Sequence, residues 1–71
     1  MMLARDPDFK YLIDDLMKIL GGREMSTYEI AQEAHMAMME VWDWLVDMEN
    51  AGMVKRRYSE GRWHWTKAKP K

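Results

Sequence analysis

Residues 24–54, EMSTYEIAQEAHMAMMEVWDWLVDMENAGMV, decide the fold of this chain. The stretch contains a short helical segment, 27–34, that opens with a capping box. In this motif the Ser26 hydroxyl accepts a hydrogen bond from the Glu29 amide, and the Glu29 carboxylate accepts one from the Ser26 amide. The pairing satisfies two otherwise unpaired amides, so we expect a helix to begin at this point.

A second helix is expected at residues 38–50, after a turn at residues 35–37. Apolar side chains recur along it at helical spacing, which predicts one buried face. Gly52 follows as the stop, because glycine accepts the left-handed conformation that ends a helix. The predicted inward stripe is Val41, Trp44, Leu45 and Met48.

The segment before this pair predicts another helix. Asp6 is a suitable N-cap, and Pro7 suits the first helical position. Apolar residues then recur at helical spacing up to Leu20, and Gly21-Gly22 ends the segment. The expected apolar face is Phe9, Leu12, Ile13, Leu16, Ile19 and Leu20.

Two strands are expected after the stretch, at residues 53–58 and 62–66. The loop between them, 59–61, carries Gly61 where a hairpin often needs positive φ. Alternation places Trp63 and Trp65 on one face of the second strand. We expect one of these two tryptophans, but not both, to lie wholly in the core.

The order of these elements resembles the winged helix-turn-helix family. Residues 26–31, STYEIA, resemble the start of its second helix. The resemblance covers nearly the whole chain and implies a small α+β domain at 1–66, with three helices, a two-stranded β-hairpin wing and a basic tail at 67–71. The residues that match the family's run from third helix into wing are Met48, Glu49, Gly52, Met53, Val54, Lys55 and Arg56.

The resemblance implies DNA binding in a regulatory role, with the third helix in the major groove and the wing on phosphates or in the minor groove. The chain departs from the family pattern at the third helix, where base-reading side chains are scarce and three acids would repel phosphate. The positions that would face the groove are Ala37, Met38, Met39, Glu40, Trp42, Asp43 and Asp47.

Charge is divided unevenly along the chain. Residues 1–54 hold four basic and eleven acidic side chains, a balance of −7, whereas residues 55–71 hold seven basic and one acidic, a balance of +6. Within 24–54 there is no lysine or arginine and there are seven acids. This polarity suggests a directional contact with a partner, or alternatively a solvated basic tail.

The leading functional hypothesis is nucleic-acid binding, of DNA in particular, led by the basic wing. Bases interleaved with rings suit phosphate contacts and stacking on exposed nucleobases. The alternative is that the rings belong to the core and the bases form a solvated strand face. The predicted wing contacts are Lys55, Arg56, Arg57, Arg62, Trp63, His64 and Lys67.

A second apolar stripe, formed by Met39, Trp42 and Val46, supports a different class of function. It can pack under residues 1–3 or against the wing, or it can bind a partner protein or a second copy of the chain. A partner for such a surface would be apolar with a basic rim. The predicted interaction residues are Met38, Met39, Trp42, Asp43, Val46 and Asp47.

Other classes of function find no support in the sequence. There are no cysteines, and His35 and His64 lack further ligands at metal-binding spacing. No nucleophile motif or phosphate-binding glycine loop occurs, so we expect neither an enzyme nor a cofactor, and no small-molecule substrate is evident. No apolar run approaches the length of a membrane span, and a soluble cytoplasmic protein is expected.

Overall fold

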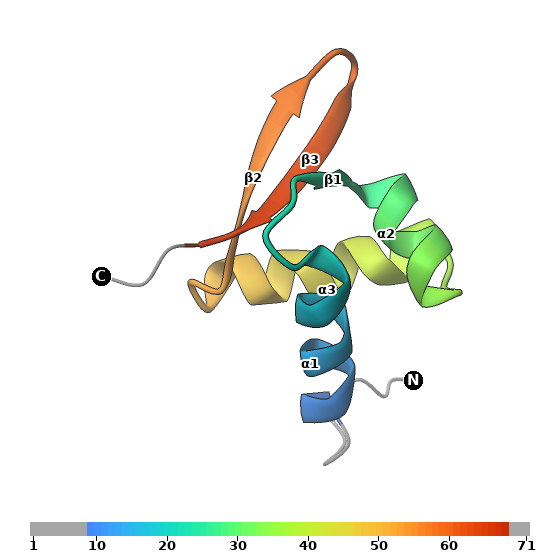
Figure 1. The fold of residues 1–71 in the computed structure, drawn as a ribbon, viewed down its shortest axis with the longest axis vertical. Coiled ribbons are helices and arrows are strands. Elements are labelled where there is room, and N and C mark those ends of the chain that lie inside the picture. Colours follow the sequence, from blue (N-terminus) through green and yellow to red (C-terminus); the bar gives the residue numbers. More distant parts are fainter. Residues whose placement is uncertain (1–8, 69–71) are drawn as a thin grey trace.

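Figure 1 shows a computed structural model of the chain, which describes the backbone of residues 9–68 and the side chains of residues 12–68. The described part contains three helices and a three-stranded antiparallel sheet, which confirms the predicted α+β class. The elements are α1 (Phe9–Leu20), β1 (Met25–Ser26), α2 (Thr27–Ala34), α3 (Met38–Asn50), β2 (Val54–Ser59) and β3 (Arg62–Lys67).

Helices α2 and α3 have the predicted bounds because their termini are set locally. The Glu29 amide donates to the Ser26 hydroxyl at 3.1 Å, and the Ser26 amide donates to the Glu29 carboxylate at 3.0 Å. At the other end of α2, His35 adopts a left-handed conformation with φ of 57°. The capping box and the left-handed C-cap therefore fix a short α2 and turn the chain into α3.

Helix α1 ends where the glycine pair predicted it would. The Gly21 amide donates to the Met17 carbonyl at 2.9 Å, with φ of +54° at Gly21. Leu16 and Leu20 are buried against the other helices, as expected from their spacing. The predicted N-terminal signals at residues 6 and 7 lie outside the described residues.

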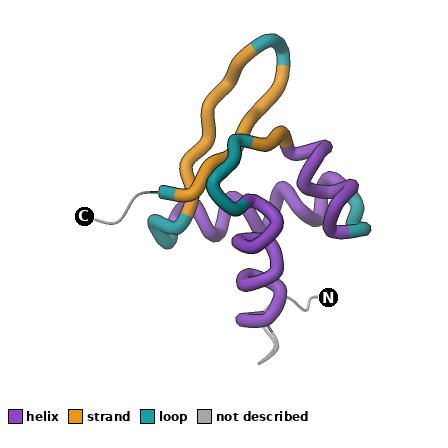
Figure 2. Tube along the Cα trace, in the orientation of Figure 1, coloured by secondary structure: helices purple, strands orange, loops and turns teal. Residues whose placement is uncertain are grey.

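The hairpin of β2 and β3 projects away from the helices, as the tube in Figure 2 shows. Ser59 pairs with Arg62, so the connection contains two residues and not the predicted three. Both of them, Glu60 and Gly61, have positive φ, at 55° and 81°. This is the geometry of a type I′ turn, whose twist matches that of the flanking strands. Strand β2 begins and ends one residue later than the predicted 53–58, and β3 ends one residue later than the predicted 62–66.

Strand β1 is an element that the sequence analysis missed. It places Met25 opposite Trp65 and Ser26 opposite His64, which gives the sheet order β1-β3-β2. A two-residue strand is too short to show the apolar alternation by which strands are recognised. The sheet consequently has three strands instead of the two predicted.

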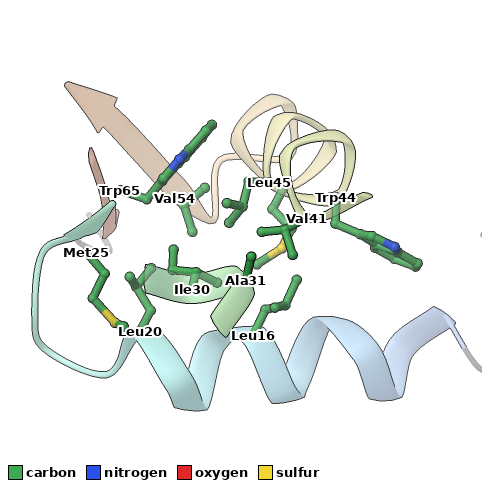
Figure 3. Packing of buried hydrophobic residues seen from close by; sticks show 11 residues of the cluster. Leu16, Leu20, Met25, Ile30, Ala31, Val41, Trp44, Leu45, Val54 and Trp65 are labelled. Carbon is green, nitrogen blue, oxygen red and sulfur yellow. The ribbon is translucent and has the colours of Figure 1, made fainter. Parts of the chain in front are cut away.

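The core lies between the three helices and the base of the sheet (Figure 3). Trp65 is fully buried, and its indole nitrogen donates to the Thr27 hydroxyl at 2.8 Å. That bond joins β3 to the start of α2 and satisfies the one polar atom of the indole. Trp63 is 38% exposed, so only one of the two wing tryptophans is a core residue, as expected. The full predicted stripe of α3 is buried: Val41, Trp44, Leu45 and Met48.

Candidate functional site

The hairpin has two chemically different faces, which follow from its register. Arg56 lies opposite Trp65 and Tyr58 opposite Trp63, so an arginine and three rings share one face. Neighbouring residues on a strand point to opposite sides, so Lys55 and Arg57 belong to the other face. The first face packs toward α3, and the second carries the basic residues outward.

An aromatic cluster joins α3 to the hairpin. The ring centroid of Trp42 lies 6.1 Å from that of Trp63 and 5.3 Å from that of Trp65. Tyr58 extends the cluster, with its centroid 4.9 Å from Trp63. These distances and tilted planes are those of favourable aromatic pairs. Trp42 is therefore partly buried, and the second apolar stripe of α3 packs in part against the wing.

The other predicted interaction residues divide by burial. Val46 is half-buried and packs against the core, and Asp47 is also half-buried. Met38, Met39 and Asp43 are exposed. The stripe is thus buried along the middle of α3 and open at the start of the helix.

Arg56 is held by side chains of its own molecule. Its guanidinium carbon lies 5.4 Å from the Trp42 ring centroid and 4.8 Å from that of Trp63. Its Nε atom lies 3.4 Å from a carboxylate oxygen of Glu49. The cation is stacked on aromatic faces and paired with an acid, so a phosphate would have to compete with both.

Arg57 is also paired within the molecule. Its Nε and Nη2 atoms donate to the two carboxylate oxygens of Glu24 at 2.8 and 2.6 Å, a bidentate geometry. The hydrogen bond from Arg57 lowers the pKa of Glu24, and the same bond raises the pKa of Arg57. The pair links β2 to the segment before β1 and offsets one positive charge of the wing.

The remaining predicted wing cations are exposed. Among the described residues, no ion pair is formed by Lys55, Arg62 or Lys67. His64 is half-buried, and its Nε2 atom lies 3.3 Å from the Ser59 carbonyl. The positive charge open to a ligand is therefore smaller than the sequence indicates.

An open groove of about 580 Å³ lies between the starts of α2 and α3 and the tip of the hairpin. Its walls are largely apolar, and Met39 is 81% exposed. The large apolar side chains exposed among the described residues all line this groove or, in the case of Tyr58, contact a residue that does. The lining residues are Ser26, Thr27, Tyr28, Met38, Met39, Trp42, Gly61, Arg62 and Trp63.

Charged side chains of opposite sign lie at or next to the groove. Asp43 lies one helical turn after Met39, on the same side of α3, and is exposed. Glu40 is exposed beside Met39. The hairpin wall opposite contains Arg62. Exposed acids on α3 thus lie next to the apolar lining of the groove, and the hairpin side of that lining contains a base.

The groove brings together residues that the sequence analysis assigned to two rival sites. Met38, Met39 and Trp42 come from the predicted protein-interaction surface, and Arg62 and Trp63 come from the predicted wing. Tyr28 was missed, because it lies on the exposed side of α2 and nothing in the local pattern marks it. The capping box begins α2 at Thr27 and so places Tyr28 in its first turn.

Neither a metal-binding cluster nor a membrane-spanning helix occurs in the part of the chain that the structure describes. Within it, no three histidines, cysteines or acids converge on a point where they could hold a metal ion. None of the described helices has the length and apolar character needed to cross a bilayer.

Comparison with known proteins assigns no family to the chain. No protein-family model matches it, and no significant relative is found among curated proteins.

Proposed function

We propose that this protein is a protein-interaction module on a winged-helix scaffold, and that the α3–hairpin groove binds apolar surface of a protein partner. The observation that carries the proposal is the concentration of exposed apolar side chains around one concave site. Contiguous exposed apolar surface is costly in water and usually marks an interface. Methionine adapts to the shape of a partner, and tryptophan and tyrosine are common binding hot spots.

Charge supports this function over groove reading of DNA by α3. The exposed positions at the start of α3 are Met38, Met39, Glu40 and Asp43, none of which suits a phosphate-lined groove. Apolar side chains contribute little to phosphate contacts but much to a desolvated protein contact. The same residues that weaken DNA binding are therefore consistent with protein binding.

Site-specific photo-crosslinking in the native host tests the proposal. A photoreactive benzoylphenylalanine replaces Met39 in the groove, and a matched control replaces Asp15, which is exposed on α1, a helix that contributes no residue to the groove lining. We expect a protein adduct from position 39 and none from position 15. An adduct with nucleic acid alone, or no adduct at position 39, would overturn the proposal.

A second candidate function, regulatory DNA binding led by the hairpin, is favoured by a different observation. By register, Lys55 and Arg57 belong to the outward face of the hairpin, away from α3, whereas Arg62 lies at the hairpin tip and lines the groove. Lys55 and Arg62 form no ion pair among the described residues, and Arg57 would have to exchange Glu24 for a phosphate. Three such contacts make a weak site with little sequence preference.

Salt dependence tests this second candidate. Three phosphate contacts predict a slope of about −3 in a plot of log binding constant against log salt concentration. The measurement is a titration of duplex and single-stranded DNA at two salt concentrations, followed by amide NMR. Shifts at residues 55–66 would support the hairpin, shifts at 37–47 would indicate groove reading, and no binding at low salt would exclude both.

A further inference from the structure

We infer that the partner in the α3–hairpin groove is a second copy of this chain, an inference that rests on the proposed protein-binding function. The charged side chains at the groove indicate which partner fits it. A foreign partner would need a basic region to meet the α3 edge and an acidic region to meet the hairpin edge. The molecule already carries charges of both signs at this site, since Arg62 lines the groove on the hairpin side and Asp43 is exposed on α3 one turn after the lining residue Met39.

Two-fold symmetry makes these edges complementary. When two copies meet face to face about an axis that runs along the groove, the α3 edge of each lies opposite the hairpin edge of the other. Asp43 of each copy then faces Arg62 of its partner, and the exposed Met39 side chains enter the opposite groove. The contact is isologous, so each favourable charge pair occurs twice.

The size of a stable interface sets how far this contact must extend. A standard interface covers about 800 Å² on each partner, which is roughly a sixth of the 5103 Å² that one chain exposes. The groove floor alone does not provide that area, so both charged edges must take part. The acidic outer side of α3 and the basic hairpin thereby gain a common role.

Sedimentation of purified protein tests the inference, with charge reversals on either edge. We expect the wild type to sediment at twice the 8.5 kDa chain mass as its concentration rises. Arg62→Glu and Asp43→Lys should each weaken the dimer roughly tenfold or more, because like charges then face each other twice. Lys18→Glu, the same charge change as Arg62→Glu at an exposed position on α1, is the matched control and should leave the dimer intact.

Mixing the two reversed variants gives the decisive result. In the mixed dimer, Glu at 62 faces Lys at 43 on one side, and Arg62 faces Asp43 on the other, so association should return to near the wild-type level. This rescue excludes misfolding as the cause of the single losses. A dimer insensitive to Arg62→Glu, or a mixture that stays monomeric, would overturn the inference.

The failures of the two proposals are distinguishable. A wild type that stays monomeric up to about 1 mM, where even weak contacts are occupied, would overturn the second-copy inference. The cross-link from position 39 to a foreign protein would then still support the proposed function. An adduct of two chains from position 39 in the host would support both.

Discussion

Single polar contacts fix how the sheet sits on the helices. Trp65 is fully buried, and its indole N–H donates to the Thr27 hydroxyl at 2.8 Å, a bond between residues far apart in the chain. A buried donor without an acceptor costs more than the bond itself contributes. The stability of this small domain should therefore depend on one hydroxyl.

Thr27→Val tests that dependence, because valine keeps the shape of threonine and removes the acceptor. We expect a loss of about 1–3 kcal/mol in the free energy of unfolding, measured by urea denaturation. In a Trp65→Phe background, which has no donor, the same substitution should cost much less. Equal losses in the two backgrounds would show that the hydrogen bond is not responsible.

The Glu24–Arg57 pair makes a prediction about pH. Because Arg57 lowers the pKa of Glu24 in the folded state, the pair's contribution to stability is present above the ordinary carboxylate pKa. It is lost as the pH falls through the lower, folded value. Carbon-13 NMR should show Glu24 titrating below its ordinary range, and Arg57→Gln should raise its pKa toward that range. An unchanged titration in Arg57→Gln would contradict the assignment.

At the scale of elements, sequence signals that act over a few residues predicted the helix ends and the hairpin, but not the contacts between distant segments. The capping box at Ser26 and the apolar stripe of α3 gave both helices their observed bounds, because the interactions involved span only a few residues. The hairpin was found from alternation and Gly61, although its loop was predicted one residue too long. Positive φ at Glu60, a residue that disfavours it, was the unrecognised part.

Contacts between distant segments were not predictable in the same way. Strand β1 exists because α2 brings Met25 beside Trp65, and no pattern within two residues indicates it. The pairing of Arg57 with Glu24 depends on that same placement. The wing was consequently expected to carry more open positive charge than it does, and the groove was seen only as two separate sites.

The hairpin turn gives a prediction at this scale. Glu60→Asn should stabilise the protein by about 0.5–1 kcal/mol, because asparagine tolerates the left-handed conformation better than glutamate. Gly61→Ala should destabilise it by about 1 kcal/mol. A Cβ at Gly61 would meet nothing within 4 Å, so the cost is one of backbone conformation alone. Thermal unfolding followed by circular dichroism measures both, and a destabilising Glu60→Asn would contradict the type I′ assignment.

For the whole molecule, the central question is which parts of α3 stabilise the monomer and which remain for a partner. Trp42 joins α3 to the hairpin through two aromatic contacts, so truncating it would damage the fold as well as any interface. Met39 lies one turn earlier and is 81% exposed, so it contributes little to the monomer. The two residues belong to one apolar stripe, but Trp42 stabilises the monomer whereas Met39 is available for association.

That separation predicts how thermal stability depends on concentration. If native chains dimerise through the groove, mass action stabilises them, and each tenfold rise in concentration adds about 0.7 kcal/mol per chain. For a domain of this size the melting temperature should rise by roughly 3–6 °C. Met39→Glu should abolish the rise and leave the melting temperature of the dilute protein nearly unchanged, because the substitution introduces charge only at the interface. Glu33→Gln, at an exposed position on α2, should preserve the rise of the melting temperature with concentration. Calorimetry over two decades of concentration decides the matter: a wild-type melting temperature independent of concentration would mean that the exposed apolar groove is not closed by a second copy of the chain.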